Sequence, residues 1–585
     1  MGLNSREIIR HPEALRTWVV LCWYRLLVSD PQPAFPVLTV IVPARNSRPW
    51  IGELVESAVS QRGVDLELIV LDNGSIDGTA EFVEALASDD ERIRLIRSSA
   101  SSAAAARNKG LLAARGEYVV FADSDDLVPD GAYNSMLTSL RASGSDMVIG
   151  NHLKFSATAT WSPTKRWYGF DAARTAVAPR ELPALMSGRA CWNRMFRRSF
   201  LERAEIRFPE IASVEDIEPM TKAFIAARSI DVVRDCVYLY RDRGDSSSLS
   251  RRSDVDVTLR YFEQEHRCAR LVRHDEVLAR QHAEIVFDAD GWAHLSRFLV
   301  SDVGTRAPDR ILRAAKDLAE EMPLDVLETA APERRALWML VLSGAASTAG
   351  DFARGMASAS SRERIAAWFD AISAIRTVDE GVAARLTIDG LVPHLVNTAS
   401  EVDEEFIEGL LPEVRDLDLP AGSSELLRAM AGAMSAERVD LIMHVSSLAH
   451  SLPFVVSRAD GSPIGLFIEG DFNGQPEDLP VRLELSQPGG RQVRLRSVRT
   501  GAHLEAELHA ADLEGGRYSV DLVLDGVSER FPTITARMPL PPLGDEHPIQ
   551  PLADRTDGWR FLIDRRGPRP SGLKQKLTRA LRMGR

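Results

Sequence analysis

Four short apolar runs alternate with helical stretches between residues 37 and 150, and this pattern restricts the fold more than any other feature. The runs are Val37–Val42, Leu66–Leu71, Ile93–Ile96 and Tyr118–Ala122. Each is too short for a helix of ordinary length and ends in polar residues. Strands that alternate with helices predict an α/β domain with a layered sheet. Because ligands of such sheets bind beyond the carboxyl ends of the strands, the polar residues there are the first candidates for a site.

The rest of the chain changes character twice. Helical periodicity dominates from about Val255 to Ala449, and after Ser451 apolar and polar residues alternate between glycine-containing turns, which predicts a small antiparallel β-sandwich. We therefore expect five parts: a helical extension (1–36), the α/β domain (37–254), a helical linker domain (255–450), the β-sandwich (451–540), and a linker with a basic amphipathic tail (541–585).

Composition excludes several classes of protein. With 71 basic and 84 acidic side chains the net charge is −13, which argues against a general nucleic-acid binder. The four cysteines have no close partner in sequence, so we expect reduced thiols and no zinc knuckle or disulfide framework. No apolar run approaches the roughly 18 residues of a membrane span, and the start does not resemble a secretory signal. The expected location is the cytosol.

The last segment, Arg565–Arg585, combines basic side chains with a leucine face. It contains eight Lys or Arg residues and no acid, and Leu573, Leu577 and Leu581 share one helical face. Such a segment either rests on an anionic membrane surface or is a solvated tail, and the sequence does not decide between the two. Peripheral contact with the inner face of a membrane is therefore one of two hypotheses for the tail.

An acidic motif follows the fourth apolar run. Asp123 and Asp125 leave the end of the predicted strand close together. Two nearby carboxylates repel unless a cation or a proton lies between them, and hard oxygen ligands suit Mg²⁺ or Mn²⁺ bridging a diphosphate. Acidic loops are also common without a ligand, so the motif alone leaves an ordinary solvated loop open.

Other motifs stand at the neighbouring strand ends and along the rest of this region. They read Val42-Pro-Ala-Arg-Asn46, Leu71-Asp-Asn-Gly-Ser-Ile-Asp-Gly-Thr79 and Ala104-Ala-Ala-Arg-Asn-Lys-Gly110, and are followed later by Trp192–Arg198, Phe208–Glu210, Val214–Ile217 and Tyr238–Arg243. In type, order and separation they resemble the inverting glycosyltransferases of family two, which have the glycosyltransferase-A fold. The resemblance covers about Val37 to Leu249.

This resemblance implies an activity and a role for individual residues. The α/β domain would be a Rossmann-like, nucleotide-sugar-binding catalytic domain that moves a sugar from a nucleoside diphosphate to an acceptor hydroxyl with inversion, assisted by Mn²⁺ or Mg²⁺. Carried over position by position, the resemblance implies that Pro43 and Asp72 lie against the nucleoside and that Asp123 lies near the ribose or diphosphate. It implies that Asp125 binds the metal and that three arginines reach the phosphates or close over the donor: Arg107, Arg241 and Arg243. On the acceptor side it places Glu215, with Asp216 as the general base.

The chemistry of sugar transfer needs the same division of labour. A cation on Asp125 would stabilise the leaving diphosphate, and a separate carboxylate would remove the proton from the attacking hydroxyl. A base at Asp216 must not share the metal site, since a bound cation would lower its basicity. The alternative for Glu215 and Asp216 is an ordinary acidic helix start, which the helix dipole favours. Trp192 would either stack on an acceptor sugar or be buried in the core.

Two departures from the family pattern bear on the donor. Arg45 stands where the family usually has an aromatic residue, and Asn73 replaces the second acid of the usual pair. That acid commonly accepts the imide proton of uracil, and an amide oxygen accepts it less strongly than a carboxylate. The identity of the donor base is therefore left open.

The layout and two rival functions complete the hypotheses. A transferase domain followed by helices and a β-sandwich loosely resembles bacterial enzymes that glycosylate wall polymers such as teichoic acids, which implies a glycan, a polyol-phosphate polymer or a lipid-linked acceptor and allows a homo-oligomer. A catalytically silent sugar-binding or scaffold protein would have lost the metal carboxylate or the base, and both are present. A sugar nucleotidyltransferase would carry a glycine-rich basic loop after the first strand, and residues 44–49 lack the glycines.

Overall fold

The computed structural model describes most of the chain between residues 36 and 563. The described residues are 36–98, 102–164, 168–243, 254–306, 308–411, 417, 419–452, 454–462, 465–473, 479–487, 492–509, 513, 516–535, 549–552 and 560–563. The expected N-terminal extension, apart from residue 36, and the basic tail lie outside them. The chain divides into two compact units, one comprising residues up to His294 with Asp317–Val326, the other Leu295–Lys316 with the residues from Leu327 onward.

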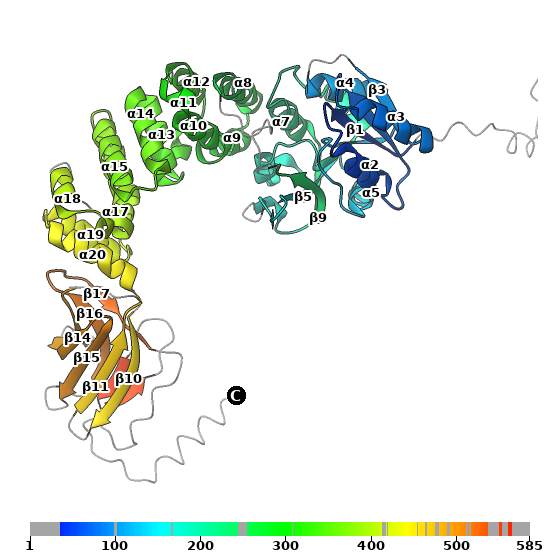
Figure 1. Ribbon diagram of the computed structural model, residues 1–585. Helices are drawn as coiled ribbons and strands as arrows, with labels where there is room; N and C mark the ends of the chain where they lie inside the picture. The colour runs from blue at the N-terminus through cyan, green and yellow to red at the C-terminus, as the bar shows by residue number, and fades with distance from the viewer. Residues whose placement is uncertain are drawn as a thin grey trace, which may run out of the picture. The chain divides into compact units, whose positions relative to one another are not determined.

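The first unit is built on a mixed nine-stranded sheet (Figure 1). Its strands are β1 (Leu38–Ala44), β2 (Leu66–Asp72), β3 (Ile93–Arg97), β4 (Tyr118–Phe121), β5 (Met147–Phe155), β6 (Thr160–Trp161), β7 (Arg174–Val177), β8 (Arg194–Arg197) and β9 (Ile230–Arg241). The order is β3-β2-β1-β4-β8-β5-β9-β7, with β6 paired to β5. β3, β2, β1 and β4 are parallel, whereas β8 is antiparallel to β4 and β5. The predicted α/β sheet is confirmed.

Helices cover both faces of this sheet. They are α2 (Ile51–Val59), α3 (Thr79–Asp89), α4 (Ala103–Ala113), α5 (Ala132–Ser143), α6 (Arg198–Arg203) and α7 (Ile217–Ala226), with short turns at Tyr168–Phe170, Pro179–Glu181 and Pro183–Ser187. The apolar side chains of α2 and α5 form one core with the strands, and those of α4, α6 and α7 form the other. β1 and β2 are buried along their whole length, as expected for strands covered on both faces.

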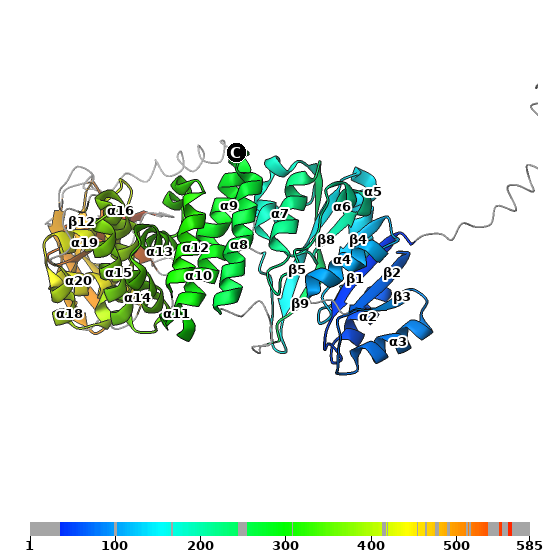
Figure 2. The same cartoon turned by 90° about the horizontal axis from the view of Figure 1, so that it is seen from above.

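Helices then follow one another without a strand from Val255 to Ser451 among the described residues. They are α8 (Val255–Val272), α9 (Glu276–Asp288), α10 (Asp290–Val300), α11 (Asp302–Arg306), α12 (Asp309–Glu320), α13 (Pro332–Ser343), α14 (Ala346–Ala357), α15 (Ser361–Arg376), α16 (Glu380–Leu386), α17 (Val392–Thr398), α18 (Glu404–Leu410), α19 (Glu425–Ser435) and α20 (Val439–Ser451), with helical turns at Leu324–Glu328, Thr387–Leu391 and Ala399–Glu401. α8 and α9 lie side by side (Figure 2), and their side chains join the second core of the α/β sheet. None of the described helices meets the length and hydropathy that a bilayer crossing requires.

Two sheets follow the helices. Their strands are β10 (Val455–Ser462), β11 (Gly465–Asp471), β12 (Val481–Ser486), β13 (Gln492–Arg494), β14 (Arg496–Thr500), β15 (His503–His509), β16 (Gly516–Leu524), β17 (Arg530–Pro532), β18 (Ile534–Thr535), β19 (Ile549–Leu552) and β20 (Arg560–Ile563). One sheet has the order β14-β15-β11-β10-β18 and the other β13-β12-β16-β20-β19, with β17 beside β16. Apart from the parallel pair β10–β18, the described pairs are antiparallel, as predicted.

Candidate active site

The carboxyl ends of three neighbouring parallel strands bring the predicted motifs to one edge of the sheet. β2, β1 and β4 are adjacent, and the loops that follow them begin at Asn73, Arg45 and Ala122. Pro43 is buried at the end of β1, opposite Leu71 of β2. Parallel pairing therefore brings the ends of β1 and β2, with Pro43 and Asp72, to the same edge of the sheet as the acidic motif.

Side-chain hydrogen bonds hold these loops together. The Thr79 hydroxyl accepts the backbone N–H of Ser47 at 2.9 Å, and Asp77 accepts that of Arg48 at 3.0 Å. The hydroxyls of Ser47 and Ser124 lie 2.6 Å apart. Asp77 and Thr79, at the end of the Leu71–Thr79 motif, thus fix the shape of the loop after β1. The contact between Ser47 and Ser124 joins this loop to the acidic motif.

Asp72 and Asn73 each present a buried oxygen that has no hydrogen-bond partner within the described part of the chain. The other carboxylate oxygen of Asp72 accepts the backbone N–H of Ser75, and the Asn73 amide N–H donates to the Ser102 carbonyl. The Oδ1 atoms of both residues remain unsatisfied. A buried unsatisfied acceptor is costly, so two of them on consecutive residues favour a ligand that supplies N–H or O–H donors.

The acidic motif is positioned by Tyr238, which lies toward the carboxyl end of β9. The Tyr238 hydroxyl donates to Asp126 and accepts the backbone N–H of Asp123, both at 2.8 Å. Asp126 also accepts the backbone N–H of Arg241 at 2.7 Å. Tyr238 stands at the start of the Tyr238–Arg243 motif, but the sequence alone assigns it no role. The residues around Tyr238 in the sequence do not indicate that two aspartates share its hydroxyl.

Asp125 is the carboxylate proposed for the metal, and an arginine is bound to it. Burial and the charge of Asp123 raise the pKa of Asp125, while Arg243 opposes the rise. The Arg243 Nε donates to Asp125 at 2.7 Å, and the guanidinium lies 4.2 Å from the centre of the Trp50 ring. The guanidinium of Arg243 thus supplies positive charge where the carboxylates of Asp123 and Asp125 repel each other. Two such carboxylates also fit the donor set of a divalent-cation site.

Arg241 holds the same motif from its backbone side. Its Nε donates to the Asp125 carbonyl at 2.7 Å, and its guanidinium pairs with Glu53 at 2.5 Å. The structure therefore places two of the three arginines predicted near the phosphates, Arg241 and Arg243, around Asp125. Glu53, on α2, is a residue that sequence reasoning missed.

Arg107 links the acidic motif to the segment proposed to carry the base. Its guanidinium donates to Asp123 and to Glu215, each at 2.7 Å, and its side chain is only 6% exposed. The neighbouring Asn108 exchanges two hydrogen bonds with the backbone of Phe208. Gly110 allows α4 to approach β1, because a Cβ atom there would lie 2.4 Å from Ile41. Within the Ala-Arg-Asn-x-Gly motif, Arg107 therefore binds two carboxylates, Asn108 binds the backbone of Phe208, and Gly110 permits close packing on β1.

Asp216 stands immediately before α7, but helix capping does not account for it. Its side chain makes no capping hydrogen bond. Burial and the charge of Glu215 raise its pKa to about 7, against the opposing effect of Arg107. Val214, two residues before it, has a φ of 56°, which is rare for a β-branched residue. A pKa near neutrality suits a group that must take up a proton at physiological pH.

Trp192 belongs to the wall behind the acidic motif. Its ring stacks on Tyr238 with centroids 4.5 Å apart and contacts Tyr240 at 5.7 Å. It packs partly buried against the first core. Core packing therefore explains one face of the ring, and the acceptor-side role of Trp192 stays a prediction.

Comparison with known proteins identifies the family of this region. Residues 39–204 match the family described as Glycosyl transferase family 2. Among curated relatives, the glycosyltransferase EpsH of Bacillus subtilis (strain 168) is 32% identical over 216 residues, which are 35% of this chain and 61% of EpsH. The succinoglycan biosynthesis protein ExoO of Rhizobium meliloti (strain 1021) is 30% identical over 237 residues, 38% of this chain and 66% of ExoO. The chain thus spans somewhat less than two thirds of either relative.

A solved structure of S. aureus TarS in complex with UDP-GlcNAc also resembles the chain. It covers 54% of this chain and 90% of the TarS fragment, with 21% identity and a TM-score of 0.45. A likeness of that degree adds nothing to the family assignment.

Proposed function

Because residues 39–204 form a glycosyltransferase family 2 domain, we propose that the protein transfers a sugar from a nucleoside-diphosphate donor to an acceptor hydroxyl with inversion. The observation that carries the proposal is the Arg107 bridge between Asp123 and Glu215. It joins the donor-side and the acceptor-side carboxylates, which are 92 positions apart (215 − 123), through one guanidinium. A single displacement at the anomeric carbon needs both groups beside the same sugar.

The donor's nucleoside would lie against Pro43, Asp72 and Asn73. The unsatisfied oxygens of Asp72 and Asn73 are acceptors, so they suit the N–H donors of a base or the hydroxyls of a ribose. The diphosphate would extend toward Asp123, with Arg107, Arg241 and Arg243 supplying positive charge. Because an amide stands at position 73, uracil is one of several bases that the site accommodates.

A divalent cation, Mn²⁺ or Mg²⁺, would be held by Asp125 with Asp123 beside it. The cation, when bound, supplies neutralisation of the charge that develops on the departing diphosphate. The residues fit it, since burial and mutual repulsion raise the pKa of Asp125 and leave its carboxylate in need of a positive partner. Arg243 provides that partner in the structure and would be released toward the phosphates when the donor binds.

Asp216 would act as the general base. Its pKa of about 7 leaves a large fraction of the group ionised at neutral pH while keeping it basic enough to accept the hydroxyl proton. Glu215, fixed by Arg107, would keep the adjacent segment in place and contribute to acceptor binding together with Trp192.

The acceptor proposed is a growing polysaccharide or wall polymer. The name of one curated relative refers to succinoglycan biosynthesis, which supports a polysaccharide product. A glycan, a polyol-phosphate polymer and a lipid-linked saccharide all offer the hydroxyl that the chemistry needs. Synthesis at the cytoplasmic face of a membrane would suit such an acceptor and is part of the same proposal.

The test is a screen of UDP-, GDP- and dTDP-sugars for Mn²⁺-dependent hydrolysis, transfer and donor binding. We expect Asp125→Ala to weaken donor binding and to remove the Mn²⁺ dependence. Asp216→Asn should bind the donor as the wild type does and transfer at least about a hundredfold more slowly, as the loss of a general base implies. Equal turnover of the Asp216→Asn variant would contradict the assignment of the base, and donor binding without turnover in the wild type would favour a silent sugar-binding protein.

A further inference from the structure

A pocket of about 530 Å³ lies within the first unit, away from the acidic motif. It is lined by the end of α8, by one face of α9 and by residues 321–323 and 325. Its apolar lining includes Val272, Met322 and Pro323. The charged residues that line it are of both signs: Arg273 and Arg280 against Glu276, Glu321 and Asp325. The proposed sugar-transfer chemistry uses none of these residues.

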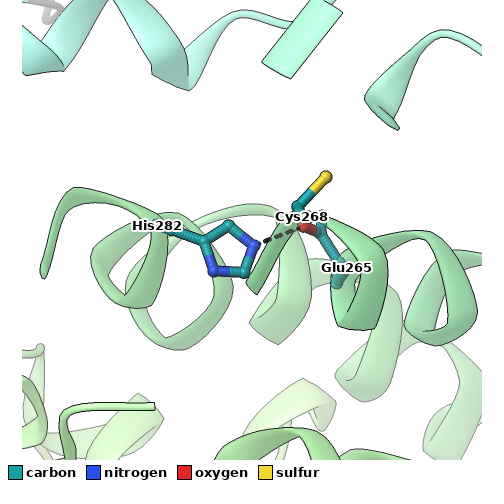
Figure 3. A group of neighbouring side chains, drawn as sticks. All are labelled: Glu265, Cys268 and His282. Atoms are coloured by element: carbon teal, nitrogen blue, oxygen red, sulfur yellow. Dashed lines mark hydrogen bonds and ion pairs between the residues drawn. The ribbon is translucent and has the colours of Figure 1, made fainter. Parts of the chain in front are cut away.

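A buried histidine, His282, is among the residues that line this pocket. His282 is 1% exposed, and its Nε2 lies 2.8 Å from an oxygen of Glu265. A dashed line marks this interaction in Figure 3. Burial works against ionisation of Glu265, yet Arg189 and His282 hold its pKa far below the usual range. Because Arg189 donates to both oxygens of Glu265, this carboxylate is the acceptor, and the His282 Nε2 carries the hydrogen of their bond. In the neutral imidazole, Nδ1 is then an acceptor. Nδ1 has no hydrogen-bond partner among the residues that the structure describes.

A metal ion is a poor candidate for this histidine. Glu265, Cys268 and His282 have potential ligand atoms within 4.8 Å of one another. However, Arg189 donates to both oxygens of Glu265 at 2.7 Å, which opposes a second positive charge there. Burial raises the pKa of the Cys268 thiol to about 12, so it would have to lose a tightly held proton to bind a metal. Figure 3 shows its sulfur directed away from the imidazole.

The lining instead suits a neutral, polyhydroxylated ligand. An anion would face three acids against two arginines in the lining, and a hydrocarbon would cover charged groups without hydrogen-bonding to them. Arg280 and Asp325, which both line the pocket, form an ion pair, so arginine donors and carboxylate acceptors occur in the same lining as the apolar side chains. A sugar ring offers C–H groups to those apolar side chains and hydroxyls that both donate and accept.

We propose that this pocket binds one sugar unit of a glycan, with a sugar hydroxyl donating to the Nδ1 of His282. That the glycan is the acceptor or product of the enzyme follows only if the proposed function is correct; the binding of a neutral sugar does not depend on it. The pocket would then hold the polymer at a distance from the reacting end. α8 packs on α7, the helix that Asp216 precedes, so the second contact lies in the same compact unit as the base.

Saturation-transfer NMR on the full chain tests this proposal with methyl hexosides as probes. Methyl glucoside, methyl galactoside and methyl N-acetylglucosaminide are used singly, with inorganic phosphate and free UDP as competitors. We expect transfer to at least one hexoside, undiminished by phosphate and by UDP. Ala279→Trp, which fills the pocket, and His282→Leu, which removes the acceptor, should each weaken binding about tenfold or more.

Val277→Trp is the matched control, because Val277 lies on the same helix, is 43% exposed and does not line the pocket. It should bind the hexoside as the wild type does, and so should Asp216→Asn. The proposal would be overturned if none of the three hexosides showed saturation transfer, or if saturation transfer were equal in Ala279→Trp and the wild type. Displacement of the hexoside by UDP would also overturn it, by assigning the signal to the donor site. If the wild-type protein binds the hexoside but transfers no sugar from any of the tested donors, the proposed function is refuted and this pocket remains a sugar site.

Discussion

Asp216 and Glu265 are two carboxylates beside buried arginines, and their pKa values move in opposite directions. Arg189 donates both ends of its guanidinium to Glu265, whose pKa falls far below the usual range although burial opposes this. Arg107 instead donates to Asp123 and Glu215, so burial and the charge of Glu215 dominate at Asp216 and raise its pKa to about 7. At Asp216, without a direct hydrogen bond, the charge of the buried arginine is outweighed by burial and by Glu215. The neighbour without that contact becomes available for proton transfer.

The largest effect expected from this comparison is on stability. Arg189→Met leaves Glu265 as a buried charge beside an uncharged side chain, which we expect to cost about 3–5 kcal/mol of the free energy of unfolding. Arg107→Met should cost clearly less, because Asp123 and Glu215 keep 30% and 14% of their side-chain surface exposed and can be solvated. Urea denaturation followed by tryptophan fluorescence measures both. Equal losses would mean that the two arginines have the same structural role.

Asp216 itself should reduce the stability of the protein at neutral pH and above. Its pKa is raised above the ordinary value of 3.8, so the stabilising contribution of the protonated form is lost as the pH rises toward and through 7. Asp216→Asn should therefore have a melting temperature a few degrees higher than the wild type at pH 8. The difference should shrink as the pH falls and vanish below about pH 4. A variant less stable than the wild type at pH 8 would contradict the raised pKa.

The smallest effect is expected at the nucleoside side. Asn73→Ala removes one of two buried acceptors, and we expect it to raise the KM for the donor several-fold with little change in kcat, since the contact is the same in the ground state and the transition state. Steady-state kinetics with the preferred donor measure this. A fall in kcat with KM unchanged would place Asn73 nearer the reacting atoms.

Much of the fold followed from local patterns. The strand runs are buried and bounded by polar residues, so β1, β2, β3 and β4 begin and end within a few residues of their predicted limits. Asp72 and Asp123 could be placed at one sheet edge because parallel strands share the direction of their carboxyl ends. The change from helices to antiparallel sheets was visible in the period of the apolar residues.

What the sequence did not reveal are contacts between segments that are far apart in the chain. The Tyr238 hydroxyl meets Asp126 across 112 positions, and Arg243 meets Asp125 across 118. Arg189 and Glu265 are 76 positions apart, and neither belongs to a motif. Spacing carries no information on such pairs, because the sheet order and helix packing that bring them together depend on the whole domain. The roles given to individual site residues stay predictions.

The pH dependence of sugar transfer tests the central claim most directly. With the preferred donor and a fixed Mn²⁺ concentration, kcat/KM should fall on the acid side with a midpoint near pH 7, because protonated Asp216 cannot accept the hydroxyl proton. The residual activity of Asp216→Asn should lack this limb. A wild-type profile that stays flat from pH 5 to pH 8, or an Asp216→Asn profile with the same limb, would contradict the account.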